Sequence, residues 1–316
     1  MFDRVSLPTP FQVGPVNAYL AGRTLVDPGP DSDEAWASLL DELERRELAP
    51  ADVEQVLITH PHPDHFGVAK RLHDAGARVL ASQTAASIVE DFPARLEYEQ
   101  RFFSDFFERC GMAPDEAETV TKLPEAFLHY AESVPIDQML AASDTVTVDD
   151  QLVTVDEITG HAPGELLFAY DGDAGRTAIV GDNVLADITP NPFLQPPDGD
   201  DAERPRVLPE YNRSLERLRG ERYDRFLPGH RAPITSPSER IESILAEHDE
   251  RTDRVHSLLD DPATPADVMN ELFPDLPVTE AFSGMSEAVG HLDVLEERGA
   301  VTVRESGGLL VYERVE

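Results

Sequence analysis

Cysteine is nearly absent from this chain of 316 residues. Cys110 is the only one, so a disulfide within the chain is excluded, and we interpret it as a small core residue. No apolar run reaches the roughly 18 residues that a bilayer-spanning helix needs. No N-terminal apolar stretch resembles a signal peptide. We therefore expect a cytoplasmic protein that does not contact a membrane.

Lysine is also scarce, because Lys70 and Lys122 are the only two and the other basic residues are arginines. The chain has 62 acidic against 26 basic residues and a formal net charge of −36, spread along its whole length. Such a surface suits molar salt, which screens the repulsion between like charges. We interpret the composition as halophilic, the alternative being an unusually acidic ordinary protein. At low salt this charge would repel nucleic acid, which we do not expect as a partner.

The densest group of polar side chains follows a short apolar run at 56–58, which indicates a buried strand. Within six residues this group contains His60, His62, Asp64 and His65. A proline on either side of His62 keeps the chain extended, so that His60 and His62 point to the same side. Imidazole nitrogens and carboxylate oxygens suit zinc, iron and manganese. Four such groups so close together predict a metal site rather than a solvated polar loop.

Four more polar residues follow apolar runs and lie beside glycine or proline: Asp27, His161, Asp182 and His230. Each would be a weak candidate alone, and Asp27 could be an ordinary turn aspartate before proline. Together they place polar side chains at the ends of several strands, a common position for a site in a layered α/β protein. None of the remaining histidines has ligand spacing, so we assign those to the surface or to packing.

In this combination the motifs resemble the signature of the metallo-β-lactamase superfamily. His-x-His-x-Asp-His at 60–65 is similar to its first ligand loop. Thr-Gly-His-Ala-Pro-Gly at 159–164, Val-Gly-Asp-Asn at 180–183 and Leu-Pro-Gly-His at 227–230 resemble the later loops, in the family's order. The resemblance covers about residues 10 to 235. It implies an α/β (α+β) fold, the four-layer αββα sandwich of that family.

The resemblance also implies two divalent metal ions, with zinc expected and iron or manganese as alternatives. It assigns the first ion to His60, His62 and His161, the second to Asp64, His65 and His230, and both to Asp182. Asp27 would support the ligands without binding metal. A metal-bridging hydroxide would attack the substrate, with Asp64, His60 and Asp182 as the expected catalytic residues. In relatives with a single ion, Asp64 would orient the nucleophilic water instead.

Two further regions are predicted from helical spacing. Residues 84–143 form an aromatic-rich helical insertion in a hydrolase domain that spans 1–247. This insertion is either a lid or wall of a substrate pocket, for a small molecule with an apolar part, or a packed helical pair that serves stability or a homodimer contact. Residues 248–316 read as helix, helix and hairpin and resemble a winged-helix module. Its second helix is acidic, so we expect a structural or dimerising role there.

The substrate is less determined than the site. A small ester, thioester or lactone is the first hypothesis, because Asp64 stands where antibiotic-hydrolysing relatives often have cysteine, and this resembles the glyoxalase-II-like (hydroxyacylglutathione-hydrolase-like) branch. The C-terminal region is similar instead to relatives described as β-lactamase-like protein 2, some of which cleave single-stranded RNA, so a ribonuclease or phosphodiesterase is the second. A non-catalytic metal-binding interaction protein is the third.

Overall fold

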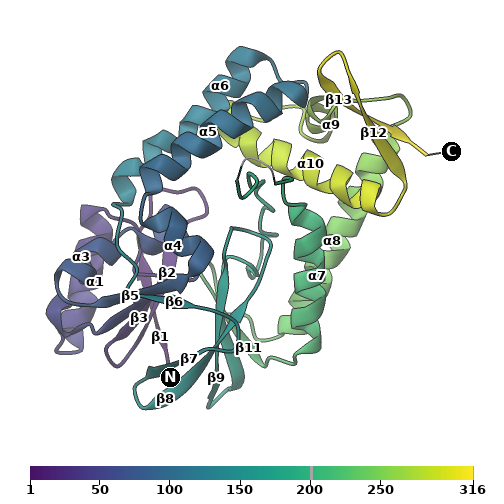
Figure 1. The fold of residues 1–316 in the computed structure, drawn as a ribbon. Coiled ribbons are helices and arrows are strands. Elements are labelled where there is room, and N and C mark those ends of the chain that lie inside the picture. Colours follow the sequence, from purple (N-terminus) through teal and green to yellow (C-terminus); the bar gives the residue numbers. More distant parts are fainter. Residues whose placement is uncertain (200–201, 316) are drawn as a thin grey trace. The chain divides into compact units, whose positions relative to one another are not determined.

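The computed structural model describes residues 1–199 and 202–315. The chain divides into two compact units, and we describe each by itself (Figure 1). The first unit comprises Met1–Arg95, Phe127–Pro190 and Arg217–Ile241. The second comprises Leu96–Ala126, Asn191–Glu216 and Glu242–Glu316. The predicted boundary near residue 247 stays a prediction.

The first unit contains a six-stranded sheet in the order β1-β2-β3-β4-β5-β6. Its strands are β1 Asp3–Leu7, β2 Val16–Ala21, β3 Thr24–Val26, β4 Gln55–Leu57, β5 Arg78–Ser82 and β6 Gln138–Leu140. The first three strands form an antiparallel meander, and β3 to β6 run parallel. Because parallel strands end at the same edge of a sheet, the residues that follow β3 and β4 come out side by side.

A second sheet in the same unit has the order β11-β10-β9-β8-β7. Its strands are β7 Thr145–Val148, β8 Gln151–Glu157, β9 Leu166–Gly172, β10 Gly175–Gly181 and β11 Arg225–Pro228. The pairs are antiparallel except β10 with β11, which is parallel. The residues after β10 and β11 therefore also share one edge, and β9 begins at that edge because it runs antiparallel to β10.

The two sheets bury a common hydrophobic core. Side chains of both belong to one cluster, including Tyr19, Leu57, Leu80, Val153, Val155, Phe168, Ile179 and Leu227. Most of these side chains are fully buried, and each contributes roughly 1.5–3 kcal/mol of transfer free energy. This packing fixes the strand ends, so loops that leave them start from a rigid base.

Helices of the first unit lie against the six-stranded sheet. α1 Asp33–Arg45 contacts β1, and α3 Ala69–Asp74 and α4 Gln83–Val89 contact β5 (Figure 1). α1 buries the stripe Ala35, Leu39 and Leu43, and the Ser32 hydroxyl caps it by accepting from the Ala35 backbone N–H. A further short helix, α2 Pro63–Phe66, lies within the first ligand loop. It begins at a proline, which is tolerated at the first helical position.

The second unit is mainly helical and ends in a hairpin. Its elements are most of α5 Phe92–Arg109 and α8 Pro237–Leu258, then α6 Pro114–Lys122, α9 Pro265–Leu272, α10 Ala281–Glu297, β12 Val301–Ser306 and β13 Leu309–Arg314. α7 Val207–Gly220 and η2 Leu123–Tyr130 contribute to both units. Two short 3₁₀ helices complete the list: η1 Pro50–Asp52 belongs to the first unit and η3 Val278–Glu280 to the second. Phe103 and Phe107 of α5 contact Phe282 of α10, with ring centroids 5.0 and 5.3 Å apart.

α10 is the helix that a winged-helix module would present to nucleic acid. Here it is buried within its own unit from Gly284 to Leu295, on more than one face. Burial of this kind leaves little of the helix for a partner, which agrees with a structural role. The winged-helix description itself stays a prediction.

The mixed α/β architecture, with two sheets that share a core, is the predicted fold class. Asp149 and Asp150 form the turn between β7 and β8. The single cysteine, Cys110, is buried in the helical core as expected. Over residues 1–199 and 202–315, we find no helix that combines the length and the apolar character needed to cross a membrane.

Candidate metal centre

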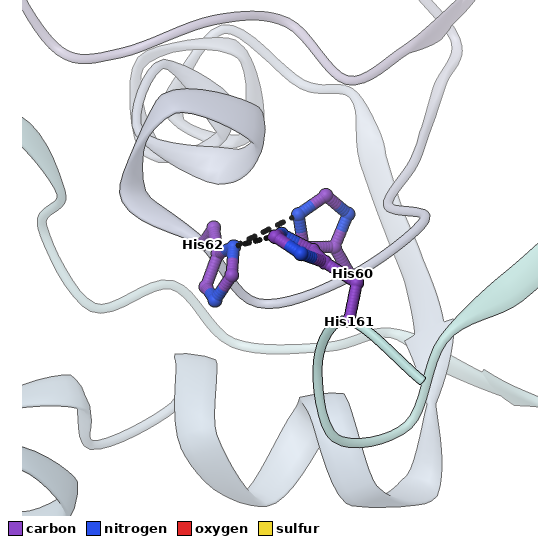
Figure 2. A group of neighbouring side chains, drawn as sticks. All are labelled: His60, His62 and His161. Atoms are coloured by element: carbon purple, nitrogen blue, oxygen red, sulfur yellow. Dashed lines mark hydrogen bonds between the residues drawn. The ribbon is translucent and has the colours of Figure 1, made fainter. Parts of the chain in front are cut away.

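Three histidines from two loops converge at the edge of the first unit. His60 and His62 follow β4, and His161 lies on the loop between β8 and β9. His62 Nδ1 is 3.1 Å from His60 Nε2 and 3.1 Å from His161 Nε2 (Figure 2). These atoms are near enough to one another to bind a single ion. The structure thus brings together the first predicted ligand set.

Asp64, His65 and His230 form a second group with the same property. Asp64 and His65 lie on α2, and His230 follows β11. Asp64 Oδ2 is 3.2 Å from His230 Nε2 and 4.0 Å from His65 Nε2. All three side chains are buried.

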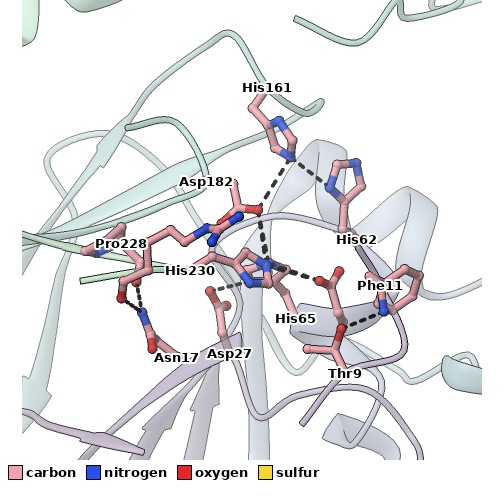
Figure 3. Close-up of polar contacts among 12 residues, drawn as sticks. Thr9, Phe11, Asn17, Asp27, His62, His65, His161, Asp182, Pro228 and His230 are labelled. Carbon is pink, nitrogen blue, oxygen red and sulfur yellow. Dashed lines mark hydrogen bonds and ion pairs between the residues drawn. The ribbon is translucent and has the colours of Figure 1, made fainter. Parts of the chain in front are cut away.

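Asp182, which follows β10, lies between the two groups. Its Oδ2 is 3.8 Å from His161 Nε2 in the first group, and 3.6 Å from His65 Nε2 and 3.4 Å from His230 Nε2 in the second (Figure 3). One carboxylate oxygen therefore reaches both groups, which is the position expected for a ligand shared by two ions.

Hydrogen bonds fix the tautomers of three imidazoles. The Thr59 hydroxyl donates to Asp27 Oδ2 at 2.6 Å, so its oxygen accepts from His60 Nδ1 at 2.9 Å. His65 Nδ1 donates to Asp27 Oδ2, and His230 Nδ1 donates to the Pro15 carbonyl, both at 2.9 Å. In each ring Nδ1 therefore carries a hydrogen and Nε2 points into the site, the arrangement that a metal-ligating histidine requires.

Charge is distributed unequally between the two groups. Burial lowers the pKa of His62 to about 3, and it lowers the pKa of His60 well below 6.5, so these two rings of the first group are neutral. Burial also opposes protonation of His65, but the carboxylates of Asp182 and Asp64 outweigh it and raise its pKa well above 6.5. Without metal, the second group thus carries a positive charge among carboxylates.

The side chains present fit divalent metal ions. His65 Nε2, His230 Nε2 and Asp182 Oδ1 are buried and have no hydrogen-bond partner among the described residues, although such atoms are normally satisfied. Gly229 leaves the necessary space, since a Cβ there would be 2.3 Å from Asp182 Oδ1 and 2.6 Å from His65 Cε1. Neutral imidazoles and ionised carboxylates are the donors that zinc, iron and manganese bind.

Asp27 lies beneath the site. It accepts hydrogen bonds from the Thr59 backbone N–H at 2.8 Å, from the Thr59 hydroxyl and from His65. Its carboxylate, with His60 and His65, also forms a compact group of possible ligands. Because these hydrogen bonds already engage the carboxylate, we favour its predicted role as a support of the ligands.

Sequence reasoning missed a buried carboxylate between the ligand loops. Glu165 Oε2 accepts from the His161 backbone N–H at 2.9 Å and from Asn183 Nδ2 at 3.2 Å. It thereby joins the loop of His161 to the residue after Asp182. Burial raises the pKa of Glu165 to about 7. A charged residue directly before the apolar run of β9 was the signal that could have identified it.

The polar residues of β2 were missed as well. Asn17 and Tyr19 are buried and donate to backbone carbonyls of the turn that carries His230. An asparagine within a strand that is otherwise buried and apolar was the available signal.

Comparison with known proteins identifies the family. Residues 12–230 match the model of the metallo-beta-lactamase superfamily, which is most of the chain and includes every predicted ligand. The chain belongs to the metallo-β-lactamase superfamily. Together with the clustered donor groups, this membership makes it a metallo-hydrolase.

Relatives match this superfamily member over nearly its whole length. A protein of Bacillus subtilis (strain 168), described as the probable metallo-hydrolase YqjP, is 32% identical over 313 residues, covering 98% of this chain and 96% of the relative. A metallo-beta-lactamase family protein from Thermus thermophilus has a TM-score of 0.79 and 26% identity, and the match covers 99% of this chain and 98% of that one. A beta-lactamase domain protein from Burkholderia ambifaria has a TM-score of 0.82 at 23% identity, with 99% and 92% covered, and supports the fold alone.

Proposed function

We propose that this metallo-hydrolase cleaves a small ester, thioester or lactone with two divalent ions, for which zinc is the expected metal. The observation that carries the proposal is the position of Asp182 Oδ2, within 3.4–3.8 Å of imidazole nitrogens from both ligand groups. His60, His62 and His161 would bind the first ion, and Asp64, His65 and His230 the second. When bound, the ions would activate water and stabilise negative charge on the substrate oxygen.

The side chains of the site have distinct tasks in such a reaction. The neutral rings of His60 and His62 leave the charge of the first ion undiminished. Burial opposes ionisation of Asp182, but the imidazoles of His230 and His65 keep its pKa below the usual range. The carboxylate is therefore ionised at every working pH. Asp64 also stays ionised, because His65 and His230 outweigh its burial and lower its pKa, so it can serve as an anionic ligand of the second ion.

Aromatic side chains beside the site support a substrate with an apolar part. Phe11 contacts Phe127 and Tyr130, with ring centroids 4.9 and 5.8 Å apart. Phe11 lies on the loop that ends at Pro15, whose carbonyl contacts His230. The Tyr130 carbonyl lies over Gly67, directly after α2. The loop before β2 and the helix η2 both contact ligand loops, and their aromatic side chains form one cluster. Within this cluster, Phe127 is partly exposed.

Two features favour a small molecule over nucleic acid. The net charge of −36 opposes a polyanionic substrate at low ionic strength. The buried α10 offers little surface for groove recognition. Asp64, in place of a cysteine at the second ion, supports the glyoxalase-II-like branch. Single-stranded RNA remains a substrate to be tested beside the others.

Metal analysis tests the site directly. Protein purified from metal-supplemented cells and held in molar KCl is expected to contain close to two transition-metal ions per chain. His60→Ala and Asp182→Ala should each lower this content. His73→Ala is the matched control, because His73 is a partly exposed histidine outside both ligand groups, and its ring nitrogens lie 3.9 and 3.7 Å from the carboxylates of Asp74 and Asp137. A wild-type content below about half an ion per chain would count against the site.

A parallel substrate screen tests the reaction. Thioesters, lactones, phosphodiesters and single-stranded RNA are assayed side by side in high salt. We expect turnover of the ester-type substrates, lowered about 10²-fold or more by Asp182→Ala, the scale on which loss of a stabilising group reduces kcat. Cleavage confined to RNA would replace the small-molecule assignment, and full activity of the Asp182 variant would remove that residue from the mechanism.

A further inference from the structure

The turn that carries His230 has an unfavourable backbone conformation. Its next residue, Arg231, has a φ of 67°, in the left-handed region. This region is sterically unfavourable for a non-glycine residue, because its Cβ comes too close to the following carbonyl oxygen. Asn and Asp tolerate it better than arginine, because their short side chains bond locally. Surrounding contacts must therefore hold the turn.

Those contacts come from β2, at the opposite end of the sequence. The Asn17 backbone N–H donates to the Gly229 carbonyl at 2.6 Å. Its side-chain Nδ2 donates to the carbonyls of Pro228 and Arg231, each at 2.9 Å (Figure 3). The Tyr19 hydroxyl also donates to the Pro228 carbonyl, at 2.6 Å. A single side chain thus bridges the residues on either side of Gly229 and His230.

Only an amide side chain satisfies this turn. Both hydrogens of Asn17 Nδ2 have a carbonyl acceptor, and the residue is 3% exposed, so water cannot easily replace it. Aspartate has the same size but no hydrogen to donate, and it would place a negative charge against two carbonyl oxygens. Alanine would leave both carbonyls without this donor.

The same strand orients the ring of His230. Pro15, at the start of this segment, accepts the hydrogen of His230 Nδ1, and Val16 forms an isolated β-bridge with His230. The position of the turn and the tautomer of the imidazole are therefore fixed together. No hydrogen bond of Asn17 reaches the loops of His60, His62 or His161 among those that the structure shows for the described residues.

We propose that Asn17 is a positioning residue for the second metal site, acting through the turn that carries His230. This inference rests on the proposed two-ion function. Loss of a residue that orients a ligand typically weakens metal binding about 10–100-fold. Because Asn17 holds the turn of His230, which is a ligand of the second ion only, the loss falls on the second ion.

The experiment titrates metal-free protein with Co²⁺ and, separately, Zn²⁺, by calorimetry and by the visible absorption of bound Co²⁺. Asn17→Asp and Asn17→Ala are expected to bind the first ion as wild type does and the second about 10–100-fold more weakly. Gln55→Glu is the matched control. Gln55 lies in the same sheet, at the start of β4, and donates its side-chain amide to Thr24 Oγ1 and to the Thr147 carbonyl, each at 2.8 Å, and neither acceptor belongs to a ligand loop.

Two further variants keep the inference testable if Asn17→Asp does not fold, as judged by circular dichroism. Asn17→Ser retains a shorter donor, and Tyr19→Phe removes one hydrogen bond to the same turn. Both substitutions should lower the affinity for the second ion by less than Asn17→Ala does. Unchanged second-ion affinity in all folded variants, with two ions in the wild type, overturns the role of Asn17 alone. A wild type that binds one ion or none overturns the two-ion site and this inference with it.

Discussion

Replacing Gly229 by alanine should disable the site through one methyl group. Gly229 precedes His230, and its φ lies outside the left-handed region, so alanine can adopt the same backbone. The added Cβ would lie 2.3 Å from Asp182 Oδ1 and 2.6 Å from His65 Cε1. The effect of the substitution is therefore steric, and it falls on residues of the proposed second and shared ligand sets.

The size of the effect follows from these distances. Non-bonded carbon atoms are most stable about 3.5–4.0 Å apart, so the Asp182 carboxylate has to move by on the order of 1 Å. The main chain cannot recoil easily, because the Gly229 N–H donates to Gly181 at 2.7 Å and its carbonyl accepts from Asn17 at 2.6 Å. A displacement of about 1 Å can lower a rate about 10²-fold, which corresponds to roughly 2.7 kcal/mol of activation free energy.

The assay combines three measurements on Gly229→Ala. Metal affinity is determined by titration of the metal-free protein. The value of kcat/KM is measured with the best substrate of the screen, and the midpoint of thermal unfolding is measured by circular dichroism. Gly220→Ala is the control, since no atom lies within 4 Å of a Cβ at that position at the end of α7. We expect the control to match the wild type, and Gly229→Ala to lose affinity and rate together.

Retention of wild-type metal affinity and kcat/KM in Gly229→Ala would refute the reasoning. It would mean that Asp182 and His65 are not confined by this turn. A loss of thermal stability with unchanged metal binding would also count against it, because the clash would then be relieved away from the site.

Three other outcomes follow from the same geometry. Asp27→Asn removes charge and an acceptor beside His65 and Thr59, and should weaken metal binding about 10–100-fold in titrations, whereas unchanged affinity would exclude a supporting role. The metal-free protein should be most stable near pH 6.5. Below this pH, stability falls because His62 takes up a proton more readily in the unfolded chain than in the folded protein, where its pKa is about 3. Above this pH, stability is lost as the pH rises through the raised pKa of His65 in the folded protein. Bound metal should abolish the loss of stability above pH 6.5. Thermal unfolding midpoints measured across this pH range, with and without Zn²⁺, test the expected loss of stability on both sides of pH 6.5. Because the chain carries −36 charges, raising KCl from 0.1 M to about 2 M should raise the unfolding midpoint by screening repulsion, and an unchanged midpoint would argue against the halophilic interpretation.

The ligand residues could be located from the sequence because each belongs to a local pattern. An apolar strand followed by a polar residue beside glycine occurs at Asp182 and His230, and parallel pairing of β10 with β11 places those two residues at one edge. Resemblance to a family then supplied the order of the loops. Helix α5 was equally predictable, because aromatic side chains recur at helical spacing within it.

The supporting roles of Asn17 and Glu165 could not be assigned in this way. Asn17 and Pro228 are 211 residues apart in the chain, and their hydrogen bond leaves no periodic signal in either segment. Glu165 likewise acts through the His161 backbone N–H of its own loop and the Asn183 side chain of another. The division into units was also beyond local patterns, because each unit is assembled from three separated segments.

Protonation explains how the site can remain folded without metal. Asp27, Asp64 and Asp182 lie close together in a buried space, where unpaired like charges are costly. The raised pKa values of His65 and His230 place positive charge among them, since the carboxylates outweigh the burial that opposes protonation of both rings. A divalent ion would displace these protons and take over the same electrostatic role. Metal binding should therefore release protons and strengthen as the pH rises.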